Sequence, residues 1–215
     1  MIGRNIFFDY DGTLIDSIST MFDIYIDYLN SLGIIGTRIE FDQLNGPSLN
    51  EIVSILKKRY NLKQSQSELI ELYKTKISEQ YKKGIKPFSD AQETLSKLKS
   101  LGKKLYLVTS NERQTVLDYI KSVNWTGFFT GYVFGDEVQR AKPYSDIYVE
   151  AIKKFGVENT DVIVIEDSIN GVHSAKGAGL VVIGVTHEAS REKLLDAQAD
   201  EIVDKLSEIP LMFSL

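Results

Sequence analysis

The chain has 215 residues, 43% of them hydrophobic and 26% charged, and a formal net charge of −5 at pH 7. This globular composition excludes a bulk basic field for nucleic acid or anionic lipid, and the absence of cysteine excludes disulfides and thiolate metal sites. No apolar run approaches the roughly 20 residues that span a bilayer, and the N-terminus has no signal-peptide pattern, so we expect a soluble, cytoplasmic protein with no membrane or nucleic-acid partner.

Short apolar runs bounded by turn residues predict five buried β-strands and a weaker sixth. In chain order they are Asn5–Phe8, Lys104–Thr109, Tyr132–Phe134, Val162–Ile165, Val181–Val185 and the weaker Glu201–Val203. From the second run onward, the strands alternate with segments of helical period. This alternation is typical of an α/β fold, and it predicts a doubly wound parallel sheet with helices on both faces.

The stretch between residues 17 and 84 breaks this rhythm, because helices are the only elements predicted in it. Apolar residues recur at helical spacing up to Gly33, which ends the first of these helices. Ser48-Leu49-Asn50-Glu51 is a capping-box pattern that starts another. We therefore expect a small all-helical domain at 17–84, inserted after the first strand of a core formed by residues 1–16 and 85–215.

The first strand ends in two acidic residues that share one face of an extended chain, Asp9 and Asp11. The carboxyl ends of parallel strands open onto the binding crevice of such sheets, so both side chains are expected there. Two close carboxylates repel each other, and a divalent cation removes that repulsion. Gly12 permits the tight turn that brings backbone N–H groups toward an anion.

The second strand ends in Thr109, Ser110 and Asn111, directly before a predicted helix. A hydroxyl and free N–H groups at such a junction suit a phosphate. They also suit an ordinary helix N-cap, and this pattern taken alone favours the N-cap.

The later strands are also followed by charged residues. Lys142 comes after the third strand, and Glu166 and Asp167 follow the fourth, where the two acids offer hard oxygen ligands for a cation. Taken alone, each pattern also fits a turn, a solvated lysine or a polar loop. Because they occur in order at the ends of successive strands, the residues together predict one site.

In this order the motifs resemble those of the haloacid dehalogenase superfamily. The resemblance rests on Asp9–Ser17, Thr109, Lys142-Pro143 and Glu166–Ser168, and it covers the chain from residue 5 to about 190. Glu166–Gly171 followed by Ala178–Leu180 is similar to the branch that holds phosphoglycolate phosphatase and β-phosphoglucomutase. That branch has a Rossmann-like core and a small helical cap after the first motif, where the strand-free stretch lies.

The resemblance implies a magnesium-dependent phosphatase that acts on small phosphate monoesters. Asp9 would attack phosphorus to form an aspartyl phosphate, and Asp11 would serve as general acid and then general base. Lys142 would neutralise charge on the phosphoryl oxygens. Mg²⁺ would be bound by Asp9, the main-chain carbonyl of Asp11, and Asp167, with Glu166 contributing directly or through water.

The resemblance also implies how the substrate is bound. Thr109, with the N–H groups around Ser110 and Asn111, would bind the phosphoryl group, and Gly12 and Thr13 are assigned to the same task. The cap would close over the substrate, exclude bulk water and carry much of the specificity.

The sequence differs from the motifs of two related families, and the differences favour phosphate hydrolysis over dehalogenation and over isomerisation of a sugar phosphate. The dehalogenases lack the second acid, present here as Asp11. The alternative is a phosphosugar mutase like β-phosphoglucomutase, whose cap carries Lys and Arg where Leu44–Leu49 has Asn and Leu. The mutase's cap histidine is also absent, since His173 and His187 both lie outside the predicted cap, and we interpret His173 as a surface or packing residue. The first motif reads Asp-Gly-Thr where the mutase has Asp-Gly-Val.

A non-enzymatic alternative is a receiver-type phosphoacceptor domain, which also combines acids, Thr or Ser, and Lys. Its phosphoacceptor follows the third strand, however, and the acids here follow the first and fourth. The expected partner is a small phosphorylated metabolite bound by a monomer. Phosphoglycolate, a sugar phosphate, a nucleotide and pyrophosphate all fit the motifs, because cap side chains choose among them.

Overall fold

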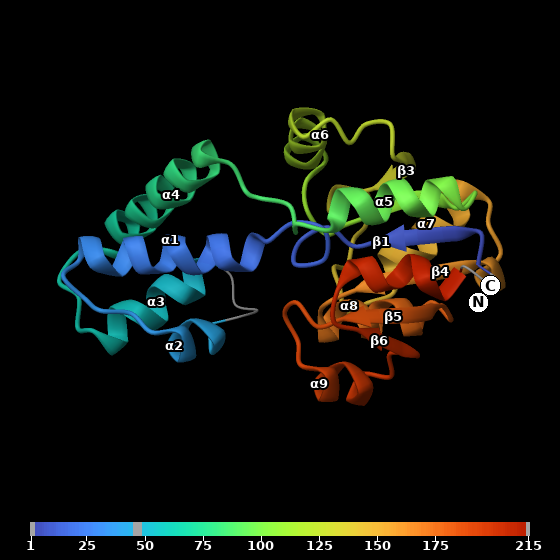
Figure 1. The fold of residues 1–215 in the computed structure, drawn as a ribbon. Coiled ribbons are helices and arrows are strands. Elements are labelled where there is room, and N and C mark those ends of the chain that lie inside the picture. Colours follow the sequence, from blue (N-terminus) through green and yellow to red (C-terminus); the bar gives the residue numbers. More distant parts are fainter. Residues whose placement is uncertain (1–2, 45–48, 214–215) are drawn as a thin grey trace. The chain divides into compact units, whose positions relative to one another are not determined.

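The computed structural model describes residues 3–44 and 49–213 (Figure 1). The chain divides into two compact units, Met1–Asp16 with Pro87–Leu215, and Ser17–Lys86. In the described residues, every strand belongs to the first unit, and the second unit is helical. Among these residues, each helix is too short or too polar to span a bilayer.

Six strands of the described residues form one parallel sheet in the order β3-β2-β1-β4-β5-β6. They are β1 (Asn5–Phe8), β2 (Lys104–Val108), β3 (Phe129–Val133), β4 (Val162–Glu166), β5 (Val181–Val185) and β6 (Glu201–Val203). This confirms the predicted doubly wound sheet. The strand order is that of a Rossmann fold, whereas receiver domains have the order 2-1-3-4-5, so the receiver alternative is wrong.

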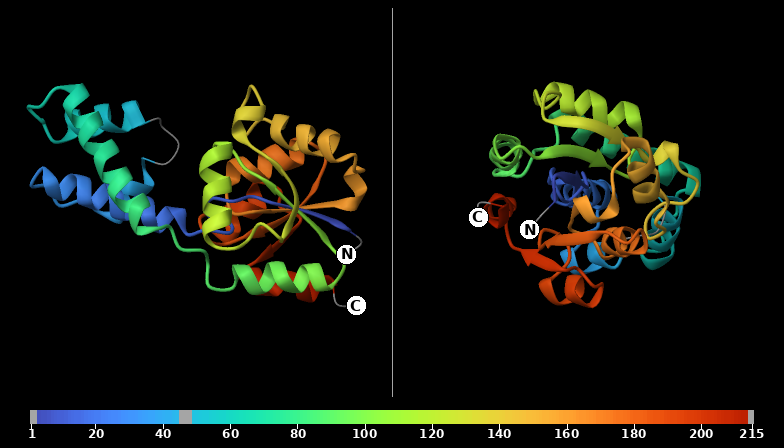
Figure 2. Two further views of the ribbon diagram at one scale, coloured as in Figure 1. Left: turned by 90° about the horizontal axis from the view of Figure 1, so that it is seen from above. Right: turned by 90° about the vertical axis from the view of Figure 1, so that its right-hand side faces the viewer.

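Helices cover both faces of the sheet. They are α5 (Ala91–Ser100), α6 (Arg113–Ser122), α7 (Asp146–Phe155), α8 (Ile169–Gly177) and α9 (Arg191–Asp196), with 3-10 turns η1 (Gly135–Glu137), η2 (Asn159–Asp161) and η3 (Leu206–Phe213). Figure 2 shows α5 and η3 on one face, and α7 and α8 on the other. Every residue of β1 and β4 is buried, as expected for central strands of a parallel sheet covered on both sides.

Strand β3 begins earlier than the predicted Tyr132–Phe134. The difference arises at Gly131, which interrupts the apolar run and weakens the strand pattern. A Cβ atom at Gly131 would lie 2.6 Å from the Phe155 ring on α7. The glycine therefore makes room for a helix side chain that packs directly on the strand backbone.

The helical unit contains α1 (Ser17–Ser31), α2 (Arg38–Asp42), α3 (Leu49–Arg59) and α4 (Gln66–Lys83). Its core is formed mainly by aromatic and aliphatic side chains of α1, α3 and α4, including Tyr28, Leu56 and Leu69. The predicted capping box begins at Ser48, which lies outside the described residues.

A buried carboxylate joins three helices of this unit. Glu40 of α2 is 8% exposed and accepts hydrogen bonds from Tyr25 of α1, Arg59 of α3, and Tyr60. Burial by itself raises the pKa of Glu40, but these hydrogen bonds and the Arg59 charge outweigh it and lower the pKa below its usual value. The stabilisation is therefore present at neutral pH and is lost as the pH falls below about 4.3, the ordinary pKa of glutamate.

We expect Glu40→Gln to lower the free energy of unfolding by about 1–3 kcal/mol, because buried donors lose their charged acceptor. Asp42→Asn is the matched control, since it makes the same change at the exposed end of the same helix, where Asp42 pairs with Arg38. The control is expected to stay within about 0.5 kcal/mol of wild type. Urea unfolding at pH 7 measures both, and equal effects of the two variants would contradict the structural role of Glu40.

Candidate active site

The site is centred on Asp9, where the strand order reverses. Asp9 directly follows β1, and its N–H donates to the carbonyl of Ile165 on the neighbouring strand β4 at 3.0 Å. β1 also pairs with β2 on its other side, so three strand ends meet here. Ligands of doubly wound sheets bind at such a switch point.

Lys142 connects two of the predicted acids. Its Nζ atom lies 2.5 Å from Asp9 Oδ1 and 2.6 Å from Glu166 Oε1, and all three side chains are at least nine-tenths buried. Tyr148 of α7 donates its hydroxyl hydrogen to the same Oε1 atom at 2.7 Å. Ser168 donates to the other oxygen, Oε2, at 3.2 Å. Both oxygens of Glu166 therefore have donors within the protein.

Asp167 is differently placed. Its Oδ1 atom accepts a hydrogen bond from the Thr13 hydroxyl at 2.7 Å, whereas its buried Oδ2 atom has no hydrogen-bond partner. That free oxygen lies against Gly12, where an added Cβ would come within 2.1 Å of it. Gly12 has a φ of +74°, which favours glycine. Oxygens of Asp9, Glu166 and Asp167 all lie within 4.8 Å of one another.

The electrostatics of this cluster fit a bound cation. Burial raises the pKa of Asp9 to about 7, with Lys142 opposing the shift and Glu166 adding to it. Burial and the charges of Asp9 and Glu166 hold the pKa of Asp167 well above its usual range. Burial lowers the pKa of Lys142, but the same two carboxylates outweigh it and leave that pKa well above its usual value. One ammonium faces three carboxylates, and the unpaired Asp167 oxygen is the donor that a hard divalent cation requires.

The loop after β2 brings the other predicted residues to this edge. Thr109 is buried, and its hydroxyl oxygen accepts the N–H of Asn111 at 3.0 Å. The Asn111 side chain donates to Asp11 Oδ2 at 3.2 Å, so it orients the second acid of the first motif. Ser110 is exposed at the same loop. The structure brings the predicted residues together at this edge of the sheet. Thr13 was predicted to bind the phosphoryl group, but its hydroxyl donates a hydrogen bond to Asp167 instead.

Three further residues support the site, and sequence reasoning gave none of them a role in it. Tyr148 binds Glu166, with Lys142 Nζ 5.2 Å from its ring centroid. Gly171 of α8 lies so close to Glu166 that a Cβ would be 1.9 Å from its carboxyl group. The Nδ1 atom of His187 lies 3.0 Å from the carbonyl oxygen of Gly12. The one available signal for His187 was its place just after β5, at the same edge of the sheet.

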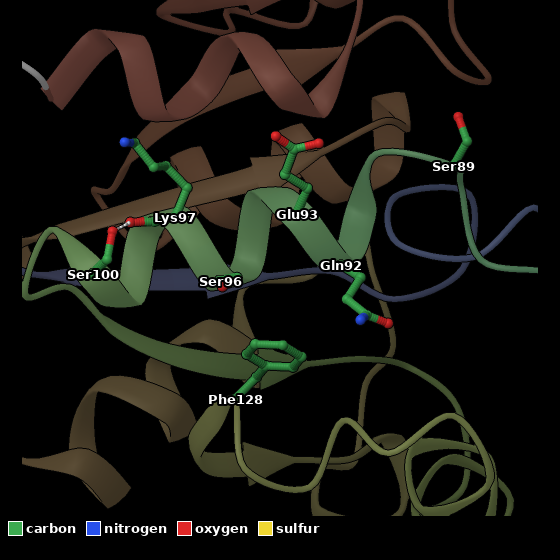
Figure 3. A pocket seen from close by; sticks show the side chains of 7 residues that line it. All are labelled: Ser89, Gln92, Glu93, Ser96, Lys97, Ser100 and Phe128. Atoms are coloured by element: carbon green, nitrogen blue, oxygen red, sulfur yellow. Dashed lines mark hydrogen bonds between the residues drawn. The ribbon is translucent and has the colours of Figure 1, made fainter.

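An open groove of about 610 Å³ runs beside α5 (Figure 3). Its lining is polar and includes Glu93, Lys97 and Ser96 of α5, with Phe128 opposite. It contains none of the predicted site residues, and its chemistry indicates no reaction.

A family model described as haloacid dehalogenase-like hydrolase matches residues 6–185. The chain belongs to this family. It is 31% identical to a phosphorylated carbohydrates phosphatase of Thermotoga maritima, over 95% of this chain and 98% of that protein. It is 27% identical to pyrophosphatase PpaX of Bacillus pumilus, over 96% of this chain and 94% of that protein. A solved structure from Thermotoga maritima, provisionally named a β-phosphoglucomutase, has a TM-score of 0.85 at 29% identity and covers 99% of this chain and 100% of its own. The predicted superfamily is thus confirmed.

The contact between Gly12 and Asp167 generates a stability prediction for this family member. Gly12 and Gly102 have the same φ of +74°, but Gly102 has open space around it. We expect Gly102→Ala to cost about 1–2 kcal/mol from backbone strain alone, because an L-residue in the left-handed region brings its Cβ too close to the following carbonyl oxygen. Gly12→Ala should cost about 1–3 kcal/mol more, because its methyl group overpacks Asp167.

Urea unfolding of the two alanine variants checks this difference. Equal losses would show that the Asp167 side chain moves aside freely and that the close contact does not constrain the site.

Proposed function

We propose that the protein is a magnesium-dependent phosphatase that hydrolyses small phosphate monoesters. One observation carries the proposal: a buried Asp167 oxygen without a partner lies in a carboxylate cluster with Asp9, and Lys142 is bound to Asp9. The family assignment supports it, as do the phosphatase names of the relatives.

Asp9, Asp167 and the main-chain carbonyl of Asp11 would hold the magnesium ion. When bound, the ion supplies positive charge against the carboxylates and the phosphoryl oxygens. Glu166 contributes less directly, because its two oxygens already accept from Lys142, Tyr148 and Ser168. We propose that its part is to fix Lys142 and that it reaches the ion at most through water.

Asp9 and Asp11 carry the two chemical steps. A carboxylate oxygen of Asp9 attacks phosphorus, the bond from phosphorus to the ester oxygen breaks, and Asp11 gives its proton to the leaving alkoxide. Water then attacks the aspartyl phosphate, Asp11 takes a proton from it, and the bond to Asp9 breaks to release inorganic phosphate. The hydrogen bond from Asn111 keeps Asp11 in place for both transfers.

Lys142 and the loop after β2 would bind the phosphoryl group. The ammonium of Lys142 is fixed by two carboxylates, so it is preorganised to neutralise charge on the transferring oxygens. The Thr109 hydroxyl and the N–H groups around Ser110 would complete the binding. We propose that the helical unit acts as the cap that selects the substrate.

The test is a screen of phosphate release across a panel of phosphorylated metabolites, led by phosphorylated carbohydrates, with magnesium and with EDTA. We expect wild type to release phosphate only with magnesium, and Asp9→Asn to lose at least about 10³-fold in kcat, because the nucleophile is gone. Asp196→Asn, at an exposed acid of α9, is the matched control and should retain wild-type activity. No release from any compound by wild type, or an active Asp9→Asn variant, would reject the proposal.

A second candidate function is that of a phosphosugar mutase, which the solved neighbour provisionally named a β-phosphoglucomutase supports. The four residues 45–48, which bear on this choice, lie outside the described residues. Analysis of the sugar-phosphate products of the same reactions separates the two functions, since a mutase converts one sugar-phosphate isomer into another without free phosphate.

Tyr148 provides a test of how Lys142 is held. We expect Tyr148→Phe to lower kcat roughly tenfold while KM stays within about twofold, because Glu166 loses a buried donor and holds Lys142 less firmly. The matched control is Tyr106→Phe, which removes a buried hydroxyl that donates to Asn5 on the neighbouring strand, outside the site. Steady-state kinetics distinguish them, and an equal effect of both changes would count against this role.

A further inference from the structure

We infer that His187 is a positioning residue that holds the turn of the first motif in its metal-binding form. The inference rests on the proposed function, since it concerns how the proposed magnesium site is kept in shape. His187 lies in the loop after β5, half-buried, and outside every motif that the sequence singled out.

The first contact of His187 is a hydrogen bond to the main chain of the motif. Its Nδ1 atom lies 3.0 Å from the carbonyl oxygen of Gly12. A carbonyl oxygen can only accept, so Nδ1 carries the hydrogen and donates it. This bond fixes the peptide between Gly12 and Thr13, and the Thr13 hydroxyl is the donor to Asp167.

The loop that carries His187 also contacts Asp167, in the acidic segment at the end of β4. Two residues after His187, the N–H of Ala189 donates to the main-chain carbonyl of Asp167 at 3.1 Å. One short loop therefore contacts both chain segments that carry proposed magnesium ligands, the turn that follows Asp9 and the end of β4. A change in the loop would alter the spacing between the two segments.

The second contact is made by the imidazole ring. It stacks on Phe88, with ring centroids 3.7 Å apart and planes at 26°. Phe88 is fixed to the motif as well, because its N–H donates to the carbonyl of Leu14 at 3.1 Å. His187 thus bridges the motif turn and the segment where the chain re-enters the α/β unit.

Two substitutions separate the contacts. His187→Phe keeps a flat ring for Phe88 but removes the donor to Gly12. His187→Asn keeps an N–H donor near the position of Nδ1 but removes the ring. We expect His187→Phe to weaken magnesium binding about tenfold, equivalent to about 1.4 kcal/mol. His187→Asn should bind magnesium within about threefold of wild type and show the lower metal-free melting temperature of the two.

Magnesium affinity is measured on the folded protein, from the rise in melting temperature as the ion is titrated, and does not depend on turnover. His173→Phe is the matched control, because it makes the same change at the chain's other histidine, exposed on α8. It should leave magnesium affinity unchanged.

The outcomes are distinguishable. If wild type binds magnesium and His187→Phe binds it equally well, this inference fails and the proposed function stands. If wild type shows no magnesium-dependent rise, the metal site of the proposed function fails, and the inference with it. If His187→Phe does not fold, His187→Asn decides: wild-type affinity supports the role of the donor, and a tenfold loss overturns it.

Discussion

The site depends on the burial of one ammonium group between two carboxylates. Lys142, Asp9 and Glu166 are all largely removed from water, and each charge would be costly to bury alone. The lysine offsets the repulsion between the two acids but leaves Asp167 uncompensated in the same cluster. The cluster therefore holds more carboxyl groups than its one ammonium can pair with.

Two adjacent acids at the end of β4 differ in their hydrogen-bond partners, although their oxygens lie in the same cluster. Glu166 faces Lys142 and Tyr148, and its oxygens are occupied. Asp167 faces the first motif and keeps one oxygen free. Glu166 is therefore fully engaged with groups of the protein, whereas Asp167 keeps one oxygen that is not.

Much of the fold and the site could be predicted because both follow from local patterns. Buried strands appear as short apolar runs, and the residues just after them must meet at one edge of a parallel sheet, which placed Asp9 and Asp167 together. The contacts of Tyr148 and His187 join residues that are far apart in the sequence. His187, for example, is 175 residues from its partner Gly12. Neither has a motif of its own, so only the three-dimensional packing reveals them. The start of β3 was missed because Gly131 interrupts the apolar pattern of the strand, and it does so to make room for the Phe155 side chain of α7.

The pairing of Ile15 with Pro87 brings together the two ends of the inserted helical unit, Ser17–Lys86. The two residues form an antiparallel bridge on the α/β unit, so the chain leaves and returns at adjacent points, with backbones roughly 5 Å apart. A gap that small can be closed by a tight turn of a few residues. The sheet therefore does not need the intervening helices to connect its first two strands. Evolution could therefore exchange, enlarge or shorten the inserted unit while the strand ends of the sheet stayed the same.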